Sequence, residues 1–359
     1  MQVAHEQVAR KIRNKIKKGE WQPGSRLPNR PSIISDVGSN AKVVQSAIHQ
    51  LVDEGFLEVG ARKMGTRVVS NPPHLSRYYL ILPYGPNSWD HFWRALVEAV
   101  EDLSGDDCDI TCFYGLGGQR DIADYQQMIA DVKNKSVAGL IFASSGDEFA
   151  GTPLLDTPGI PRVAITSHWA LPGIPKIHLD IDGFVSRAVA HLAEQGRKKL
   201  AILSPNPETA ETFRQSLAEH GLDCNSGCIQ YPRRSLKDSA RCAVDLMMQL
   251  QPANRPDSLI IADDNMIEGS VETLTSSGIK VPEELALVTM NNFPHIVQSQ
   301  LPVTRLGFDI PALLGLLMKQ LREVSEGRDI PENTNLSVIS ETEFNHTNMK
   351  KAPSLNMYP

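Results

Sequence analysis

Residues 40–69 read NAKVVQSAIHQLVDEGFLEVGARKMGTRVV, and a helical periodicity is followed at once by a strand periodicity within this stretch. The first half spaces apolar residues at i, i+3, i+4 and i+7, which predicts a helix that begins near Asn40 and buries one face. Gly55 supplies the left-handed position at which such a helix ends. Residues 56–59 and 66–69 are rich in β-forming residues and bracket a basic tip, which predicts a hairpin.

The residues before this stretch predict two more helices. Apolar residues recur at i, i+4 and i+8 from Val8, and Gly19 ends that helix. A second, short helix is predicted after Pro28, with Asn29 as its N-cap and Pro31 in its first turn. Three helices and a basic hairpin predict a winged helix-turn-helix, whose last helix enters the major groove of DNA while the wing contacts the backbone or minor groove.

The charge of the chain is divided in the same way. The first 75 residues hold 12 lysines and arginines against 6 aspartates and glutamates, and the remaining 284 hold 24 against 36. A small basic region joined to a large acidic one indicates that the basic region meets a polyanion, which we expect to be double-stranded DNA.

The N-terminal region resembles the GntR family of bacterial transcription regulators. The resemblance is carried by Gly19, by residues 23–28, by Gly38, by residues 47–57 and by residues 65–68. It implies a winged helix-turn-helix DNA-binding domain over residues 1–70.

The resemblance also implies which residues contact DNA. The family usually has arginine where this chain has Pro31, Ala41 and Gln45. The side-chain amide of Gln45 can pair with adenine, and the apolar side chain of Val43 can contact a thymine methyl group. We expect DNA contacts from eleven residues: Arg26, Arg30, Asn40, Lys42, Val43, Gln45, Ser46, Arg62, Lys63, Thr66 and Arg67. The alternative for any one of them is a solvated surface residue without a role.

Residues 71–77 include Pro72 and Pro73 and are predicted to be a short, stiff linker. Beyond them, buried strands alternate with amphipathic helices, a pattern that predicts parallel sheets with helices on both faces. Strands are predicted at residues 78–82, 109–113, 139–142, 162–166, 200–203, 258–261 and 286–290. Helices are predicted at residues 93–103, 122–133, 184–195, 210–220, 239–250 and 266–277.

This region is similar to the LacI-type effector domain, which is related to type 1 periplasmic sugar-binding proteins. The matching stretches are residues 138–142, 160–164, 180–201 and 264–283. The resemblance implies an α/β domain of two lobes over residues 78–346, a ligand in the cleft between the lobes, and a homodimer. Lobe 1 is expected at about 78–178 and 303–327, lobe 2 at about 179–302 and 328–346, and a tail at 347–359.

The resemblance places effector contacts in the loops that follow the strands. The residues at these positions are Asn87, Ser88, Trp89, Phe92, Ser144, Ser145, His168, Trp169, Thr209, Asp264, Asn291 and Phe308. Aromatic faces with carboxylate and amide acceptors suit a sugar, but the family arginine that forks onto sugar hydroxyls is Thr209 here. The alternative role for the aromatic residues is packing between secondary-structure elements. For one of Asp263 and Asp264 the alternative role is to cap a helix.

These patterns predict a ligand-responsive transcription regulator, a repressor, that is cytoplasmic, needs no cofactor or metal and does not engage a membrane. The effector is expected to be a sugar or sugar derivative. The chain has no G-x-x-x-x-G-K-[ST], G-x-S-x-G or H-E-x-x-H motif, which argues against an enzyme. The alternative is a DNA-binding homodimer whose effector domain has lost its ligand and serves assembly alone.

Overall fold

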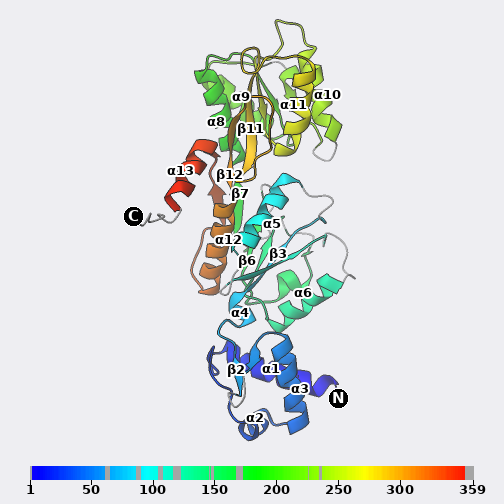
Figure 1. Ribbon diagram of the computed structural model, residues 1–359, viewed down its shortest axis with the longest axis vertical. Coiled ribbons are helices and arrows are strands. Elements are labelled where there is room, and N and C mark those ends of the chain that lie inside the picture. Colours follow the sequence, from blue (N-terminus) through cyan, green and yellow to red (C-terminus); the bar gives the residue numbers. More distant parts are fainter. Residues whose placement is uncertain are drawn as a thin grey trace, which may run out of the picture. The chain divides into compact units, whose positions relative to one another are not determined.

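A computed structural model of the chain describes residues 2–60, 65–85, 90–103, 108–115, 123–144, 146, 149–166, 173–224, 226–233 and 237–351. The chain divides into two compact units (Figure 1). The first comprises Met1–Ser88, Val100–Lys176 and Leu317–Glu332, and the second comprises Trp89–Ala99, Ile177–Leu316 and Asn333–Pro359. No helix in the described part of the chain is long and apolar enough to cross a membrane.

The N-terminal part of the first unit is the predicted winged helix-turn-helix. Its elements are α1 (Gln2–Lys17), α2 (Arg30–Val37), α3 (Ala41–Asp53), β1 (Leu57–Val59) and β2 (Thr66–Val68). The two strands pair antiparallel, with Leu57 opposite Val68. Apolar side chains from every one of these elements form one buried cluster, which holds the three helices and the hairpin together.

Side-chain caps explain where α2 and α3 begin. Asn29 precedes α2 and accepts a hydrogen bond from the Ser32 amide at 2.9 Å, and Asn40 precedes α3 and accepts one from the Val43 amide at 3.0 Å. After α3 the backbone turns at Gly55, whose φ of 83° suits glycine and directs the chain into the hairpin. The predicted cap at Asn29, the predicted start of a helix near Asn40 and the predicted turn at Gly55 are confirmed.

A six-stranded sheet has the order β13-β7-β6-β5-β3-β4. Its strands are β3 (Arg77–Ile81), β4 (Asp109–Phe113), β5 (Gly139–Phe142), β6 (Arg162–Ile165), β7 (Lys176–Leu179) and β13 (Asn333–Leu336). Strand β3 pairs in parallel with both β4 and β5, and β5 pairs in parallel with β6. The helices before, between and after these strands along the chain are α4 (Pro73–Ser76), α5 (His91–Leu103), α6 (Ala123–Asn134), α7 (Pro153–Asp156) and α12 (Ile310–Ser325). Most of α5 and the first half of α12 belong to the second unit.

The second unit contains another six-stranded sheet, of order β14-β12-β11-β10-β8-β9. Its strands are β8 (Leu200–Leu203), β9 (Ile229–Gln230), β10 (Ser258–Ile261), β11 (Ala286–Phe293), β12 (Thr304–Asp309) and β14 (Ile339–Ser340). All neighbours run parallel except β14 against β12. The helices are α8 (Ile181–Glu194), α9 (Thr209–Glu219), α10 (Lys237–Met248), α11 (Ile267–Ser276) and α13 (Glu341–Lys351), with 3₁₀ turns at η3 (Ser226–Cys228) and η4 (Asp264–Met266).

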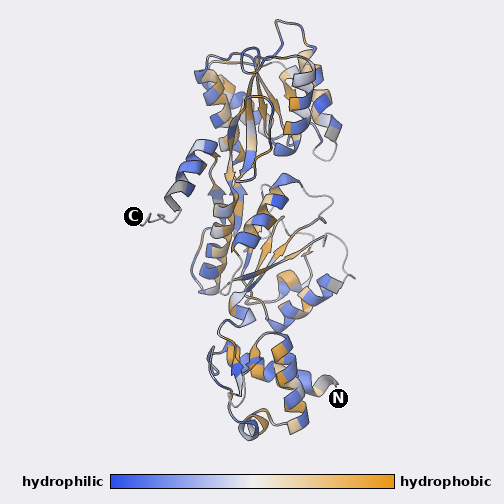
Figure 2. Cartoon of the chain, in the orientation of Figure 1, coloured by the Kyte–Doolittle hydropathy of each residue, from blue (hydrophilic) through white to orange (hydrophobic). Residues whose placement is uncertain are grey.

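The second unit has the layered arrangement expected of a doubly wound fold. Helices α8 and α9 pack together on one side of its sheet, and α10 and α11 pack together on the other (Figure 1). Strands β8, β10 and β11 are buried along their whole length, as is typical of parallel strands covered on both faces. Figure 2 shows the hydrophobic residues concentrated on the strands and on the inner faces of the helices. The predicted fold class, an α/β body behind a winged helix-turn-helix, is confirmed.

Two segments are more regular than the sequence suggested. The predicted linker contains a short helix, α4, and both Pro72, which precedes it, and Pro73, its first residue, are buried. At the other end, α13 extends to Lys351, into the stretch expected to be a tail. The domain limits given above, 1–70, 71–77 and 78–346, stay a prediction.

Candidate DNA-binding surface and effector site

Helix α3 has one buried and one open face. Val44, Ala47, Ile48 and Leu51 are at most 5% exposed and join the core of the domain. On the other side, Lys42, Ser46 and His49 are exposed, and Val43 and Gln45 are partly exposed. The i, i+3, i+4 spacing of the apolar residues therefore leaves a polar stripe of the kind that a recognition helix presents to base edges.

The open face of α3 carries a chain of polar contacts. Arg30 Nη2, from the start of α2, donates to Gln45 Oε1. The Gln45 amide nitrogen lies 2.5 Å from His49 Nε2, one turn further along α3. Both ends of the Gln45 amide are thus engaged, so its orientation is restrained before any base is met. His49 was absent from the predicted contacts, although its i+4 spacing from Gln45 is the signal that could have indicated it.

Asn40 and Ser46, two further residues predicted to contact DNA, also make hydrogen bonds within or next to α3. Asn40 uses its side-chain oxygen to cap the helix, so its amide NH₂ is the group left to face DNA. Ser46 donates to the Lys42 carbonyl at 3.2 Å, a local contact within one turn.

The hairpin is braced by the segment before α2. The Leu27 amide donates to Thr66 O at 2.9 Å, and Arg26 forms an isolated antiparallel bridge with Arg67. A Cβ at Gly65 would lie 2.8 Å from Arg26 Nε, so the Arg26 guanidinium covers this glycine at the base of the wing. Arg26, Thr66 and Arg67 therefore lie together. The predicted tip residues Arg62 and Lys63 lie outside the described residues.

In the second unit, a cluster of polar side chains lies where β10 ends beside β11. Asp264 is 2% exposed and accepts a hydrogen bond of 2.6 Å from Asn292 Nδ2. Asn265 Nδ2 donates to Asp263 at 2.8 Å and to Asp264 at 3.3 Å. Asp263 also accepts from the Asn265 amide at 3.0 Å and caps η4, which is the capping alternative given for one of the two aspartates.

Asn291, the neighbour of Asn292 on β11, is fully buried. Its Nδ2 donates to Thr289 Oγ1 at 2.9 Å, two residues back on the same face of the strand. The Oδ1 atoms of Asn291 and Asn292 are buried and have no hydrogen-bond partner among the described residues. A buried acceptor without a donor is costly, by about 1–3 kcal/mol, and such groups are frequently completed by a ligand or water.

The other predicted effector residues lie in different environments. Thr209 is 4% exposed at the first turn of α9, and its hydroxyl donates to Asn206 O at 2.7 Å. Phe308 is fully buried in β12, and Phe92 and Ser144 are partly exposed. Asn87, Ser88, Trp89, Ser145, His168 and Trp169 lie outside the described residues.

One contact to this cluster was not anticipated. The backbone amide of His91, the first residue of α5, donates to Asn265 Oδ1 at 3.1 Å. Asn265 therefore joins the end of β10 to the N-terminus of α5, two segments 174 residues apart. No group of three or more metal-ligating side chains occurs among the residues that the structure describes.

Two parts of the chain match known families. Residues 4–68 match the profile described as bacterial regulatory proteins, gntR family, and residues 189–341 match a periplasmic binding protein-like domain. Catabolite control protein A of Staphylococcus xylosus is 23% identical over 208 residues, which cover 55% of this chain and 62% of that protein. An HTH-type transcriptional regulator of Lachnoclostridium phytofermentans is 22% identical over 183 residues, which cover 50% of this chain and 54% of that protein.

Solved structures share the fold at low identity. A LacI family regulator from Lactobacillus casei with bound sucrose superposes with a TM-score of 0.56 and 17% identity, covering 74% of this chain and 98% of that one. The complex of the transcriptional regulator CelR with cellobiose gives a TM-score of 0.59 and 18% identity, covering 84% and 91%. Both resemblances predicted from the sequence are confirmed.

Proposed function

We propose that this chain, which joins a GntR-type winged helix-turn-helix to a LacI-type effector domain, is a ligand-responsive transcription regulator and not an enzyme. The observation that carries the proposal is the open polar face of α3 beside a braced wing, on a domain whose helices and hairpin share one buried core. Arg30, Gln45 and His49 would read bases, while Lys42 and Arg67 would contact phosphates.

The effector would be a sugar or sugar derivative bound at the cluster around Asp264. Sugar hydroxyls donate hydrogen bonds, and Asn292 Oδ1, on the side chain that contacts Asp264, is an acceptor that has no donor among the described residues. Asp264 adds a carboxylate that is already oriented by Asn292. Sucrose and cellobiose in two proteins of the same fold support this ligand class.

We further propose that the regulator acts as a homodimeric repressor. Two copies of the winged helix would meet two half-sites about one helical turn apart, and effector binding would change their spacing. The effector has to bind the two states of the dimer unequally, since only a difference in affinity shifts their populations.

The DNA-binding part is tested by selecting duplexes from a random pool with the full chain and measuring affinity against salt. Lys42→Ala is expected to weaken binding and lower the salt slope by about one counterion, as removal of a phosphate contact does. Lys319→Ala, on α12 in the body, is the matched control and should leave the slope unchanged. No selected sequence, or equal slopes for the two variants, would contradict the proposed surface.

The effector part is tested by thermal unfolding with mono- and oligosaccharides. A ligand that binds only the folded chain raises the melting temperature by mass action. A saturable rise that disappears in Asn292→Leu, measured against the melting temperature of that variant without sugar, would support the proposed site. No rise with any sugar would favour the second candidate, a DNA-binding dimer without a ligand, which the locally bonded Thr209 in place of the family arginine also favours.

A further inference from the structure

The carboxyl end of α6, in the first unit, presents carbonyl groups that the helix itself does not use. The helix ends at Asn134, and the next residue, Lys135, has a φ of 52°, the left-handed conformation that glycine usually supplies there. The last carbonyls of a helix lack intrahelical donors and carry the negative end of its dipole. This end is therefore a site for a cation.

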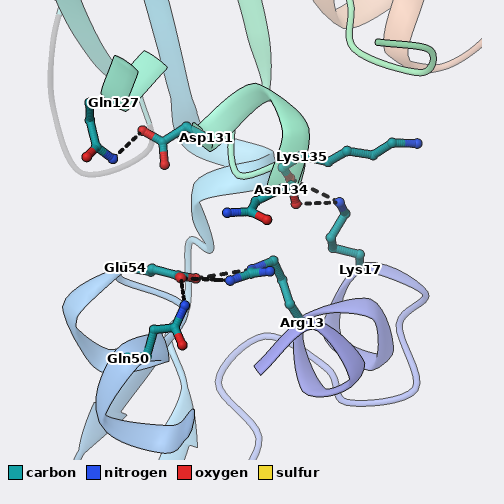
Figure 3. Close-up of polar contacts among 8 residues, drawn as sticks. All are labelled: Arg13, Lys17, Gln50, Glu54, Gln127, Asp131, Asn134 and Lys135. Carbon is teal, nitrogen blue, oxygen red and sulfur yellow. Dashed lines mark hydrogen bonds and ion pairs between the residues drawn. The ribbon is translucent and has the colours of Figure 1, made fainter. Parts of the chain in front are cut away.

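Lys17, the last residue of α1, brings its side-chain nitrogen to these carbonyls from the winged-helix domain. Its ammonium donates to Lys135 O at 3.0 Å and to Asn134 O at 3.4 Å (Figure 3). Lys17 and the two acceptors are more than 100 residues apart in the chain, so the contact is a tertiary one between the winged helix and the α/β part of the first unit.

Helix α1 is held rigidly within its own domain one turn before this contact. The Arg13 side chain is 2% exposed and donates to both carboxylate oxygens of Glu54, at 2.7 and 2.5 Å, at the end of α3 (Figure 3). Gln50 donates to the same carboxylate at 2.9 Å, and the Arg13 guanidinium lies over the Phe56 ring. A displacement of Lys17 would therefore move α1 and α3 together.

The linker provides the second half of the joint. The His74 ring stacks on Phe56 with centroids 5.7 Å apart and an 11° angle between planes. Ser76 Oγ donates to Asn71 O at 3.1 Å and Pro72 O at 3.2 Å, which closes α4. Burial lowers the pKa of Lys17 to about 8 and that of His74 to about 4, with the charges of Lys135 and Arg13 adding to the first and that of Lys17 to the second. Both side chains are only partly exposed, and the charge of Lys17 acts on His74.

We propose that Lys17 docks the winged-helix domain on the carboxyl end of α6, and that this joint restrains the recognition helix and carries the state of the effector domain to DNA. The second clause rests on the proposed function, and the first does not. Lys17 is here a positioning residue, which acts through α1 and the Arg13–Glu54 pair on α3.

Docking is tested by cleavage of the full chain with chymotrypsin after Leu75, which is 55% exposed within α4. Lys17→Gln is expected to raise the rate of this cut at least threefold, because the undocked linker opens more often. Lys18→Gln, which removes the adjacent exposed lysine, is the matched control and should cleave like the wild type. Equal rates for the two variants would overturn the docking.

A second variant with the opposite expected effect on cleavage distinguishes loss of docking from general unfolding in Lys17→Gln. Lys135→Gln removes a like charge that acts on Lys17 and leaves the Lys135 carbonyl in place, so its cut after Leu75 should be slower than in the wild type. A rate that rises instead would contradict the contact.

The role in DNA binding is measured separately, as affinity for a selected duplex. Lys17→Gln is expected to change that affinity at least threefold relative to Lys18→Gln, with both variants carrying the same net charge. Faster cleavage with equal affinities would leave docking standing and overturn the transmission. Failure of the wild type to bind any duplex would refute the proposed function while the cleavage result stood by itself.

Discussion

Gly307 is the position at which the smallest substitution should have the largest effect on the second unit. It lies on β12 opposite Asn291 of β11. A Cβ at Gly307 would press on the Asn291 backbone oxygen, 2.7 Å from its carbonyl carbon and 2.9 Å from its amide nitrogen. These are backbone atoms of a paired strand, so they cannot rotate away as a side chain would.

The magnitude follows from this geometry. Ordinary contact begins at 3.4 Å, so the two strands would have to separate by well over half an ångström along their buried pairing. Overpacking of this kind costs about 1–3 kcal/mol, and each ladder hydrogen bond that is weakened adds up to about 1 kcal/mol. Gly307→Ala should therefore destabilise the second unit by about 3 kcal/mol, which lowers its melting temperature by about 10 °C.

Calorimetry of the full chain measures this effect, and α12 offers the control. Gly315 lies inside that helix, is exposed, and has nothing within 4 Å of a Cβ built on it. Gly315→Ala should raise stability by about 0.5–1 kcal/mol, because alanine loses less backbone entropy in a helix than glycine. If Gly307→Ala melts within a degree of the wild type, or if both variants shift in the same direction, the close approach of β12 to Asn291 is refuted.

Three further predictions concern the joint and the polar cluster. Docking lowers the pKa of Lys17 from its ordinary value near 10.5 to about 8, so docking releases a proton and strengthens as pH rises through 8. The rate of cleavage after Leu75, normalised to a small peptide substrate, should therefore fall about tenfold from pH 7 to pH 9. A rise in that rate would contradict the burial of the Lys17 ammonium. The pKa of His74 is lowered to about 4, so its neutral ring contributes its full stabilisation above pH 6.5, and this contribution is lost as pH falls toward 4. His74→Phe should therefore remove this part of the acid-induced fall in melting temperature, measured between pH 7 and pH 5. Asn292→Leu should destabilise the chain by about 1.5–3 kcal/mol in urea unfolding, because it removes the donor that lies 2.6 Å from the buried Asp264 carboxylate. An unchanged free energy of unfolding would show that another donor of equal strength serves Asp264.

Periodicity in the sequence located most elements, and its failures have physical reasons. Strand β11 was expected to end at Met290, because two asparagines follow and polar residues at the end of an apolar run suggest a loop. The strand continues to Phe293 because β12 pairs with it to that residue, and Thr289 and Asp264 accept hydrogen bonds from the two asparagine side chains. Such partners come from the tertiary fold, and one of them lies on a different strand end, so no local pattern reveals them.

The candidate sites also differ in whether a local sequence pattern could reveal them. The open face of α3 could be predicted because it is the complement of an apolar stripe within 13 residues of one helix. The role of Lys17 could not, because its acceptors are backbone carbonyls, which have no sequence signature, and they follow more than 100 residues later. From the sequence alone, Lys17 is one of several lysines on α1.

The division of charge gives the joint a consequence for DNA binding. The first 75 residues carry six more cationic than anionic side chains, whereas the remaining 284 carry twelve more anionic ones. DNA therefore attracts one part of the chain and repels the other, with the repulsion felt over about one Debye length, 8–10 Å at physiological salt. A winged helix that is free to turn could hold DNA away from the acidic body, whereas a docked one holds both at a set separation. The affinity of Lys17→Gln relative to Lys18→Gln should accordingly depend on ionic strength, with the difference shrinking as salt rises, because screening removes the repulsion that docking fixes in place. A difference that stayed constant from 50 mM to 500 mM salt would mean that the joint acts through the geometry of α3 alone.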